Sequence, residues 1–289
     1  MDLDGDGRRD ILSGSYSLQQ QEMNGPGVFQ VLYGKEDGRF RRAEVLKGTN
    51  GEPLVIPPKG EPTNANTCTR PFAVDWNGDG HLDLVVGNFA GTFYLFKGQG
   101  KGRFLPEAEE IKAHGQPLSI YYHSDPFVVD WDGDGDLDLL SGSYEGGVQW
   151  AENYAGPRRS PLLKNFRWLI DRGRWLEKGQ LLRDGDLKGP LSCTRIWVDD
   201  VNSDGKLDIL VGDLVPLVSP ADKVTEGEFT RKLADWKKAI AKASKERASA
   251  GNDPKKQDEA YWRYDELYNQ RSEFMKEDET GFVWLYLRK

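Results

Sequence analysis

Four short loops rich in aspartate contain the residues of this chain whose types and spacing are best suited to chemistry. The pattern D-x-[DN]-x-D-G-x-x-D begins at Asp2, Asp75, Asp130 and Asp200. Positions 1, 3 and 5 place oxygen side chains on one side of a tightly curled loop, the glycine at position 6 permits the turn, and the aspartate at position 9 closes the shell. Calcium prefers six to eight such oxygen ligands. The sequence therefore predicts about four calcium ions, one in each loop.

The predicted calcium ligands are the side chains at positions 1, 3, 5 and 9 and the backbone carbonyl at position 7 of each loop. They are Asp2, Asp4, Asp6, Arg8 and Asp10; Asp75, Asn77, Asp79, His81 and Asp83; Asp130, Asp132, Asp134, Asp136 and Asp138; and Asp200, Asn202, Asp204, Lys206 and Asp208. Without a cation, so many neighbouring carboxylates would repel one another, and some would take up protons.

Three other interpretations of these loops compete with calcium binding by a β-protein. An EF-hand requires flanking helices and a glutamate at position 12. That position holds Ser13, Val86, Ser141 and Val211, and the flanks read as strands, so an EF-hand is excluded. The loops could also be turns that bind nothing, or they could supply catalytic carboxylates. Four equivalent copies would be an unusual way to build one active site, so calcium binding is favoured.

The segments around the loops repeat as well, and they predict short strands. Apolar runs rich in β-formers precede three loops and follow all four, and successive loops begin 73, 55 and 70 residues apart. Four short strands in each unit are typical of a propeller blade. We therefore predict an all-β propeller of about four blades. Residues 1–221 form the blades, of which the first and last are incomplete, and residues 281–289 add a strand to the last one.

Residues 222–280 break this pattern and predict a helical hairpin inserted in the last blade. An apolar stripe at helical spacing marks its first helix: Phe229, Leu233, Trp236, Ile240 and Ala243. A second stripe marks the other helix: Tyr261, Tyr264, Tyr268 and Met275. The hairpin serves either packing or the docking of a partner.

The loops, their β flanks and the repeat length resemble FG-GAP/VCBS repeats, the calcium-binding blades of integrin-α-like propellers. The resemblance covers roughly residues 1–215 and 281–289, and the Asp loop is its specific part. It implies a propeller in which calcium ions stabilise the blade turns. Such repeats occur mostly in extracellular or cell-surface proteins, so the resemblance implies a role in adhesion or binding.

A second group of residues recurs just upstream of three loops. Cys68, His123 and Cys193 each stand seven residues before a loop, and the residues two positions further on are Arg70, Asp125 and Arg195. Equivalent residues of a propeller form a ring about its axis. The Cys/His/Cys set resembles zinc or copper ligands, and the Arg/Asp/Arg set suits an anionic or sugar ligand at the channel mouth. The alternative is plain packing, with Arg–Asp pairs between neighbouring blades.

The residues just after each second strand are also small, polar or aromatic, and we expect them near the same channel. They are Ser15-Tyr16, Asn88-Phe89, Ser143-Tyr144 and Asp213-Leu214.

The net charge, the apolar runs and the cysteine count argue against several classes of function. The formal net charge of −8 argues against a nucleic-acid partner, and no apolar run is long enough to span a membrane. Two cysteines do not make a disulfide framework. No secretory signal is present, but residue 2 already lies in the first motif, so we expect a truncated N-terminus.

We predict a calcium-stabilised binding or adhesion module that is not an enzyme. We expect it to act in an extracellular, periplasmic or cell-surface location, with a glycan or protein as its ligand. No serine-triad signature, phosphate loop or HExxH motif is present. The alternative is an enzyme, or a propeller associated with one, that acts on polysaccharide or an anionic substrate at the channel mouth.

Overall fold

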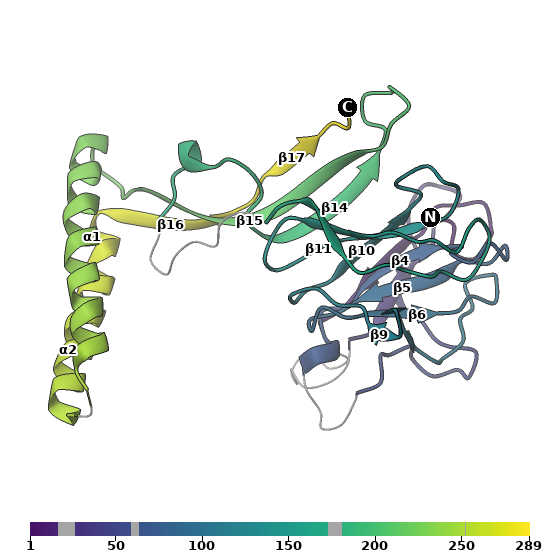
Figure 1. The fold of residues 1–289 in the computed structure, drawn as a ribbon, viewed down its shortest axis with the longest axis horizontal. Helices are drawn as coiled ribbons and strands as arrows, with labels where there is room; N and C mark the ends of the chain where they lie inside the picture. Colours follow the sequence, from purple (N-terminus) through teal and green to yellow (C-terminus); the bar gives the residue numbers. More distant parts are fainter. Residues whose placement is uncertain (17–26, 59–63, 173–180, 252) are drawn as a thin grey trace. The chain divides into compact units, whose positions relative to one another are not determined.

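A computed structural model of the chain describes residues 1–16, 27–58, 64–172, 181–251 and 253–289, which form two compact units (Figure 1). Unit 1 comprises Met1–Trp175, Gly189–Leu214 and Gly281–Lys289. Unit 2 comprises Leu176–Lys188 and Val215–Thr280.

Unit 1 is built from antiparallel sheets, one for each repeat. The first sheet has the order β1 (Ile11–Gly14), β2 (Phe29–Leu32), β3 (Glu44–Val45). The second has the order β4 (Arg70–Val74), β5 (Asp83–Gly87), β6 (Phe93–Phe96), β7 (Glu109–Glu110). The third has the order β10 (Asp125–Val129), β11 (Asp138–Gly142), β12 (Val148–Ala151), β13 (Arg167–Ile170).

The fourth sheet places β15 (Asp208–Pro220) between β14 (Ser192–Asp199) and β17 (Val283–Tyr286). A small hairpin of β8 (Lys112–Ala113) and β9 (Gln116–Pro117) lies between the second and third repeats in sequence. Figure 1 shows β14 and the first half of β15 as a hairpin with the fourth Asp loop at its tip. Of the predicted all-β propeller, the mostly β structure with several antiparallel sheets is confirmed, whereas closure into a propeller of four blades stays a prediction.

Each core of unit 1 is shared by two consecutive sheets. Strand β5 is buried along its whole length, and its side chains alternate between two cores. Leu84 and Val86 pack with Phe29 of the first sheet, whereas Val85 packs with Leu139 of the third. A third core joins the third and fourth sheets. Because both faces of β5 are covered, this strand reads as a continuous apolar run rather than an alternating one.

Unit 2 contains the predicted helical pair, α1 (Glu226–Ser249) and α2 (Pro254–Gln270). The side chain of Thr225 caps α1 by accepting a hydrogen bond from the Glu228 N–H. The side chain of Asp253 caps α2 by accepting a hydrogen bond from the backbone N–H of Lys255. The buried core of the unit is Val218, Phe229, Leu233, Trp236, Phe274 and Met275.

Part of the predicted insert is strand rather than helix. The second half of β15 pairs with β16 (Met275–Thr280), so the sequence-based placement of Met275 on the second helical stripe is wrong. The chain leaves α2 after Gln270 through the short turn η3 (Arg271–Glu273). Pairing with the second half of β15 then holds Met275–Thr280 as a strand.

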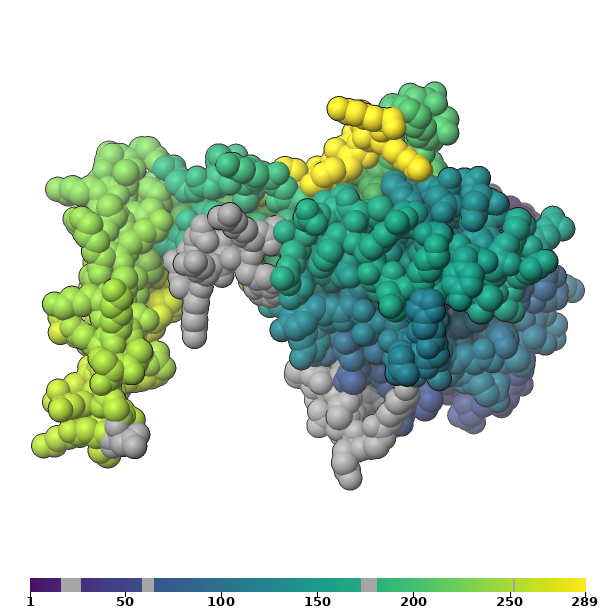
Figure 2. All heavy atoms as spheres, viewed as in Figure 1, coloured from purple at the N-terminus to yellow at the C-terminus, as the bar shows by residue number. Residues whose placement is uncertain are grey.

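The second helix of the pair is only lightly covered within unit 2. It has no buried residue, and Trp262 is 68% exposed. Figure 2 shows the side chains of the helical pair (yellow-green) open to solvent on the face in view. Docking of a partner by this pair stays a prediction.

Candidate functional site

The aspartate at position 1 curls each of the four loops. In the third loop, Asp130 accepts hydrogen bonds from the Gly133 N–H at 2.8 Å and from the Gly135 N–H at 3.0 Å. In every loop one oxygen of this aspartate accepts from the glycine at position 6, and that glycine has a φ of 83° to 94°. Only glycine adopts this conformation without strain, which explains its place in the pattern.

The aspartate at position 9 is buried and has a structural role that the pattern did not reveal. In the third loop, Asp138 accepts from the Trp131 N–H at 3.0 Å, at the start of the loop, and from the Asn153 N–H at 2.7 Å, two residues beyond β12. Asp10 and Asp208 make the same two kinds of bond in their repeats. This carboxylate therefore links the start of the Asp loop to the backbone just beyond the second strand that follows the loop.

Two of the loops gather three acidic side chains closely enough to hold one cation. A ligand oxygen from each of Asp2, Asp4 and Asp10 lies within 4.8 Å of the others, and Asp130, Asp132 and Asp138 form the same arrangement. Burial raises the pKa of Asp138 to about 6. Burial and the neighbouring Asp134 raise the pKa of Asp132.

The second and fourth loops differ because position 3 is an asparagine. The amide of Asn77 donates to Asp79 at 3.0 Å, and that of Asn202 donates to Asp204 at 3.2 Å. In the second loop Asp83 is buried and accepts from the Gly98 N–H at 2.9 Å, and burial raises its pKa.

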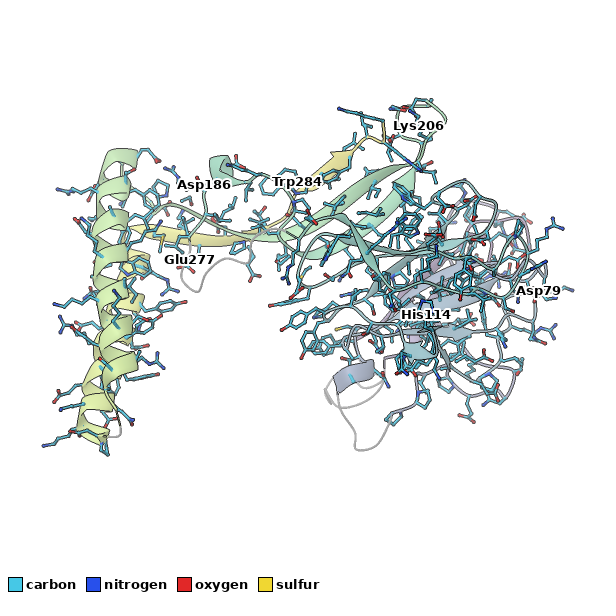
Figure 3. The ribbon with its side chains drawn as sticks, in the orientation of Figure 1. Asp79, His114, Asp186, Lys206, Glu277 and Trp284 are labelled. Atoms are coloured by element: carbon cyan, nitrogen blue, oxygen red, sulfur yellow. The ribbon has the colours of Figure 1, made fainter. Side chains whose placement is uncertain are left out.

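The side chains at positions 5 and 7 lie outside the two acidic groups. Each position-5 aspartate accepts from the N–H of position 7, and Figure 3 shows Asp79 and Lys206 at the outer ends of their loops. In the first loop, Arg8 forms an ion pair with Asp6. In the third, the Asp136 side chain is buried and accepts from the Gly156 N–H at 2.7 Å. The residues present therefore fit calcium best at positions 1, 3 and 9.

Four of the six predicted ring residues form a charged cluster in unit 1. Asp125 lies between two guanidinium groups, with its Oδ1 3.9 Å from Arg70 Nε and 3.7 Å from Arg195 Nε. Arg70 Nη2 lies 3.1 Å from His123 Nδ1. Because arginine can only donate, Nδ1 accepts, and the proton of the neutral imidazole sits on Nε2. Burial first, and then Arg70 and Arg195, lower the pKa of His123 to about 4.

The two cysteines do not form a disulfide, and both interact electrostatically with Arg70 of this cluster. Burial raises the pKa of Cys68, so its thiol is protonated at neutral pH. The ligand atoms of Cys68, His123 and Cys193 do not all lie within 4.8 Å of one another, so these three do not form a metal group among the described residues. The structure thus brings together the Arg/His/Asp/Arg set rather than the Cys/His/Cys set.

The part of the chain that carries the second and third loops has a family match. Residues 75–141 match the FG-GAP-like repeat family, from the start of the second Asp loop into β11. The family prediction is confirmed on these residues, which include two of the four loops. No curated protein is significantly similar in sequence to this chain.

A buried hydroxyl joins this FG-GAP-like repeat and its neighbours to one another, and the sequence reasoning missed it. Ser124 Oγ accepts from the Asn88 N–H at 2.8 Å and donates to the Thr92 carbonyl at 2.8 Å. Thr194 bonds Ser143 and Gly147 in the same manner. Thr69 makes the corresponding bonds to Ser15 and Val28 in the first repeat. The signal was a Ser or Thr between the two ring positions of each repeat.

In the first three repeats, the glycine that ends the motif lies against the same joint. A Cβ on Gly87 would meet the Ser124 carbonyl oxygen at 2.1 Å, and one on Gly142 would meet that of Thr194 at 2.4 Å. No side chain fits there, so this glycine is required by the close approach of two backbones.

No helix within the described residues is long and apolar enough to cross a bilayer.

Proposed function

We propose that the chain is a calcium-stabilised propeller module that binds a glycan or protein ligand outside the cell or at its surface, without catalysing a reaction. The observation that carries this proposal is the pair of acidic groups in the first and third Asp loops, where three carboxylates converge. The FG-GAP-like repeat at residues 75–141 supports the propeller and the extracellular location.

Calcium would stabilise the fold at the point where each loop is tied to its sheet. The position-9 carboxylates are already held by backbone N–H groups, and each carboxylate oxygen has a further lone pair for a cation. A cation also offsets the repulsion among the three carboxylates. At a calcium concentration ten times Kd, one site adds about 1.4 kcal/mol to the free energy of unfolding. Four sites are then comparable with a typical net stability of about 5–15 kcal/mol.

Two affinity classes follow from the loop chemistry. The first and third loops offer carboxylates at positions 1, 3 and 9, whereas Asn77 and Asn202 replace one carboxylate by an amide in the second and fourth. Calcium affinity rises with the number of charged ligands. We therefore propose that the first and third loops bind calcium more tightly than the other two.

Calorimetric titration of EDTA-treated protein with calcium, together with thermal unfolding, tests this function. We expect about four ions per chain and a melting temperature that falls on chelation. Asp130→Asn should remove one tight site and lessen the stabilisation by calcium. Asp171→Asn, which removes an exposed carboxylate outside the loops, should change neither. Absence of binding at millimolar calcium, or a melt that EDTA leaves unchanged, would refute the proposal.

A further inference from the structure

The cluster around Asp125 carries more positive than negative charge. Two guanidinium groups, Arg70 and Arg195, face one carboxylate, and His123 is neutral at pH 7. The cluster is therefore positive in a chain whose formal net charge is −8. A local positive site on an acidic protein favours an anionic ligand.

The arginines hold Asp125 loosely and keep donors available. Neither Nε lies within 3.5 Å of the carboxylate, so both contacts are ion pairs without a hydrogen bond. Arg195 Nη1 donates to the Thr194 carbonyl at 3.2 Å, and its Nη2 has no acceptor among the described residues. The Arg195 side chain is 44% exposed. A half-exposed guanidinium with unused donors is suited to a ligand carboxylate, which it can bind through two parallel hydrogen bonds.

Aromatic rings border the same cluster. Tyr144 stacks on His123 at 5.6 Å between ring centroids, and Phe89 meets His123 edge-on at 4.7 Å. Phe89 also contacts Tyr122, which is 43% exposed. The face of an aromatic ring is electron-rich and attracts the weakly positive C–H groups of a sugar ring.

At the ring positions Cys68, His123 and Cys193, the backbone N–H groups already donate hydrogen bonds, and the backbone is strained. The N–H groups of Cys68, His123 and Cys193 donate to the carbonyls of Tyr16, Phe89 and Tyr144 of the preceding repeat. A peptide strand therefore finds no free edge at these N–H groups, and recognition has to use side chains. All three residues have φ near 50°, a left-handed conformation that non-glycine residues rarely adopt and that is common at functional sites.

We propose that this cluster is a binding site for a carboxylated sugar. Arg195, with Arg70 behind it, binds the carboxylate of the ligand, and the Nε2–H of His123 donates to a ligand oxygen. Tyr144 and Tyr122 supply the aromatic surface for the sugar ring. This inference rests on the proposed binding function and names the ligand class of the module.

Titration of the full chain in calcium-containing buffer with methyl glucuronide and methyl glucoside, followed by ligand-observed NMR, tests the proposal. The two probes differ only at C6, which is a carboxylate in the glucuronide and a CH2OH group in the glucoside. We expect the glucuronide to bind at least about tenfold more tightly, because its carboxylate can form a charge-assisted bidentate contact with Arg195. Equal binding of both probes would overturn the proposal, as would a lack of glucuronide binding.

Variants then assign the site. Arg195→Gln should weaken glucuronide binding about tenfold, whereas Arg39→Gln, which removes an exposed arginine paired with Asp37, should leave it unchanged. Asp125→Asn should leave glucuronide binding unchanged or strengthen it, because the substitution removes the carboxylate that competes for the two arginines. A purely structural role would instead make both cluster variants bind less tightly, and that result would overturn the proposal.

Two further measurements separate the possible failures. Calcium titration of the same samples shows whether a variant is folded. If Arg195→Gln no longer binds calcium, Arg195→Lys replaces it, and we expect a several-fold loss because lysine lacks the planar fork. Calcium binding by the wild type without glucuronide binding would overturn this inference and leave the proposed function intact. Binding of a hexaglutamate peptide in place of the glucuronide would also overturn it.

Discussion

Replacement of Thr194 by valine tests the buried hydroxyl that joins the third and fourth repeats. The side chain is fully buried, and valine has nearly the same shape without the hydroxyl. Thr194 Oγ1 accepts from the Ser143 N–H at 2.9 Å and donates to the Gly147 carbonyl at 2.8 Å. The substitution removes both bonds and places a methyl group against two buried polar groups.

The expected cost follows from these two bonds. A buried N–H left without an acceptor costs about 1–3 kcal/mol, and the lost bond to the carbonyl costs about 1 kcal/mol more. Thr194→Val should therefore lower the free energy of unfolding by about 2–4 kcal/mol. For a domain of about 150–250 residues, each kcal/mol moves the melting temperature by about 2–4 °C, so the shift should be about 4–16 °C.

Urea unfolding in calcium-containing buffer measures this cost, with Thr49→Val as the matched control. Thr49 is exposed in a turn of unit 1, so the same substitution there should cost less than about 0.5 kcal/mol. The midpoint for Thr194→Val should fall while the slope of the transition stays unchanged. If the two variants had stabilities within about 0.5 kcal/mol of each other, the joint would contribute nothing measurable and the reasoning would be refuted.

Two other perturbations test neighbouring features. Gly87→Ala should destabilise the chain by at least about 1–3 kcal/mol in urea unfolding, because its Cβ would lie 2.1 Å from the Ser124 carbonyl oxygen. Gly227→Ala in α1, where a Cβ meets nothing within 4 Å, should be neutral or stabilising; similar costs at both sites would contradict this. His123 has a folded pKa of about 4 against about 6.5 when unfolded, so the unfolded state binds more protons between these values. Stability should therefore fall as pH drops through that window, and His123→Asn, which suits the left-handed φ, should flatten this part of the profile; an unchanged profile would count against it.

Much of the β architecture could be predicted from local sequence. The Asp loops fix where each hairpin turns, since the position-1 carboxylate and the position-6 glycine act within a few residues of each other. The apolar runs on either side then predict the two strands that the loop connects, as β10 and β11 confirm. The FG-GAP-like match at residues 75–141 supports the same repeats.

The sequence was less informative where a residue has two roles. Asp138 reads as a calcium ligand, yet it also bonds the N–H of Asn153, 15 residues away. Met275 continues a helical spacing, yet it pairs with Pro220 in a strand, because a local pattern cannot reveal a partner strand elsewhere in the chain.

The sequence by itself determined the oxygen-rich loops, the strands around them and the chemistry available at each ring position. Only the tertiary structure decided which of those groups meet. Arg70 reaches His123 across 53 residues, and Thr194 reaches Ser143 across 51. Contacts at such separations depend on the packing of one sheet against the next, which no short-range spacing in the sequence specifies.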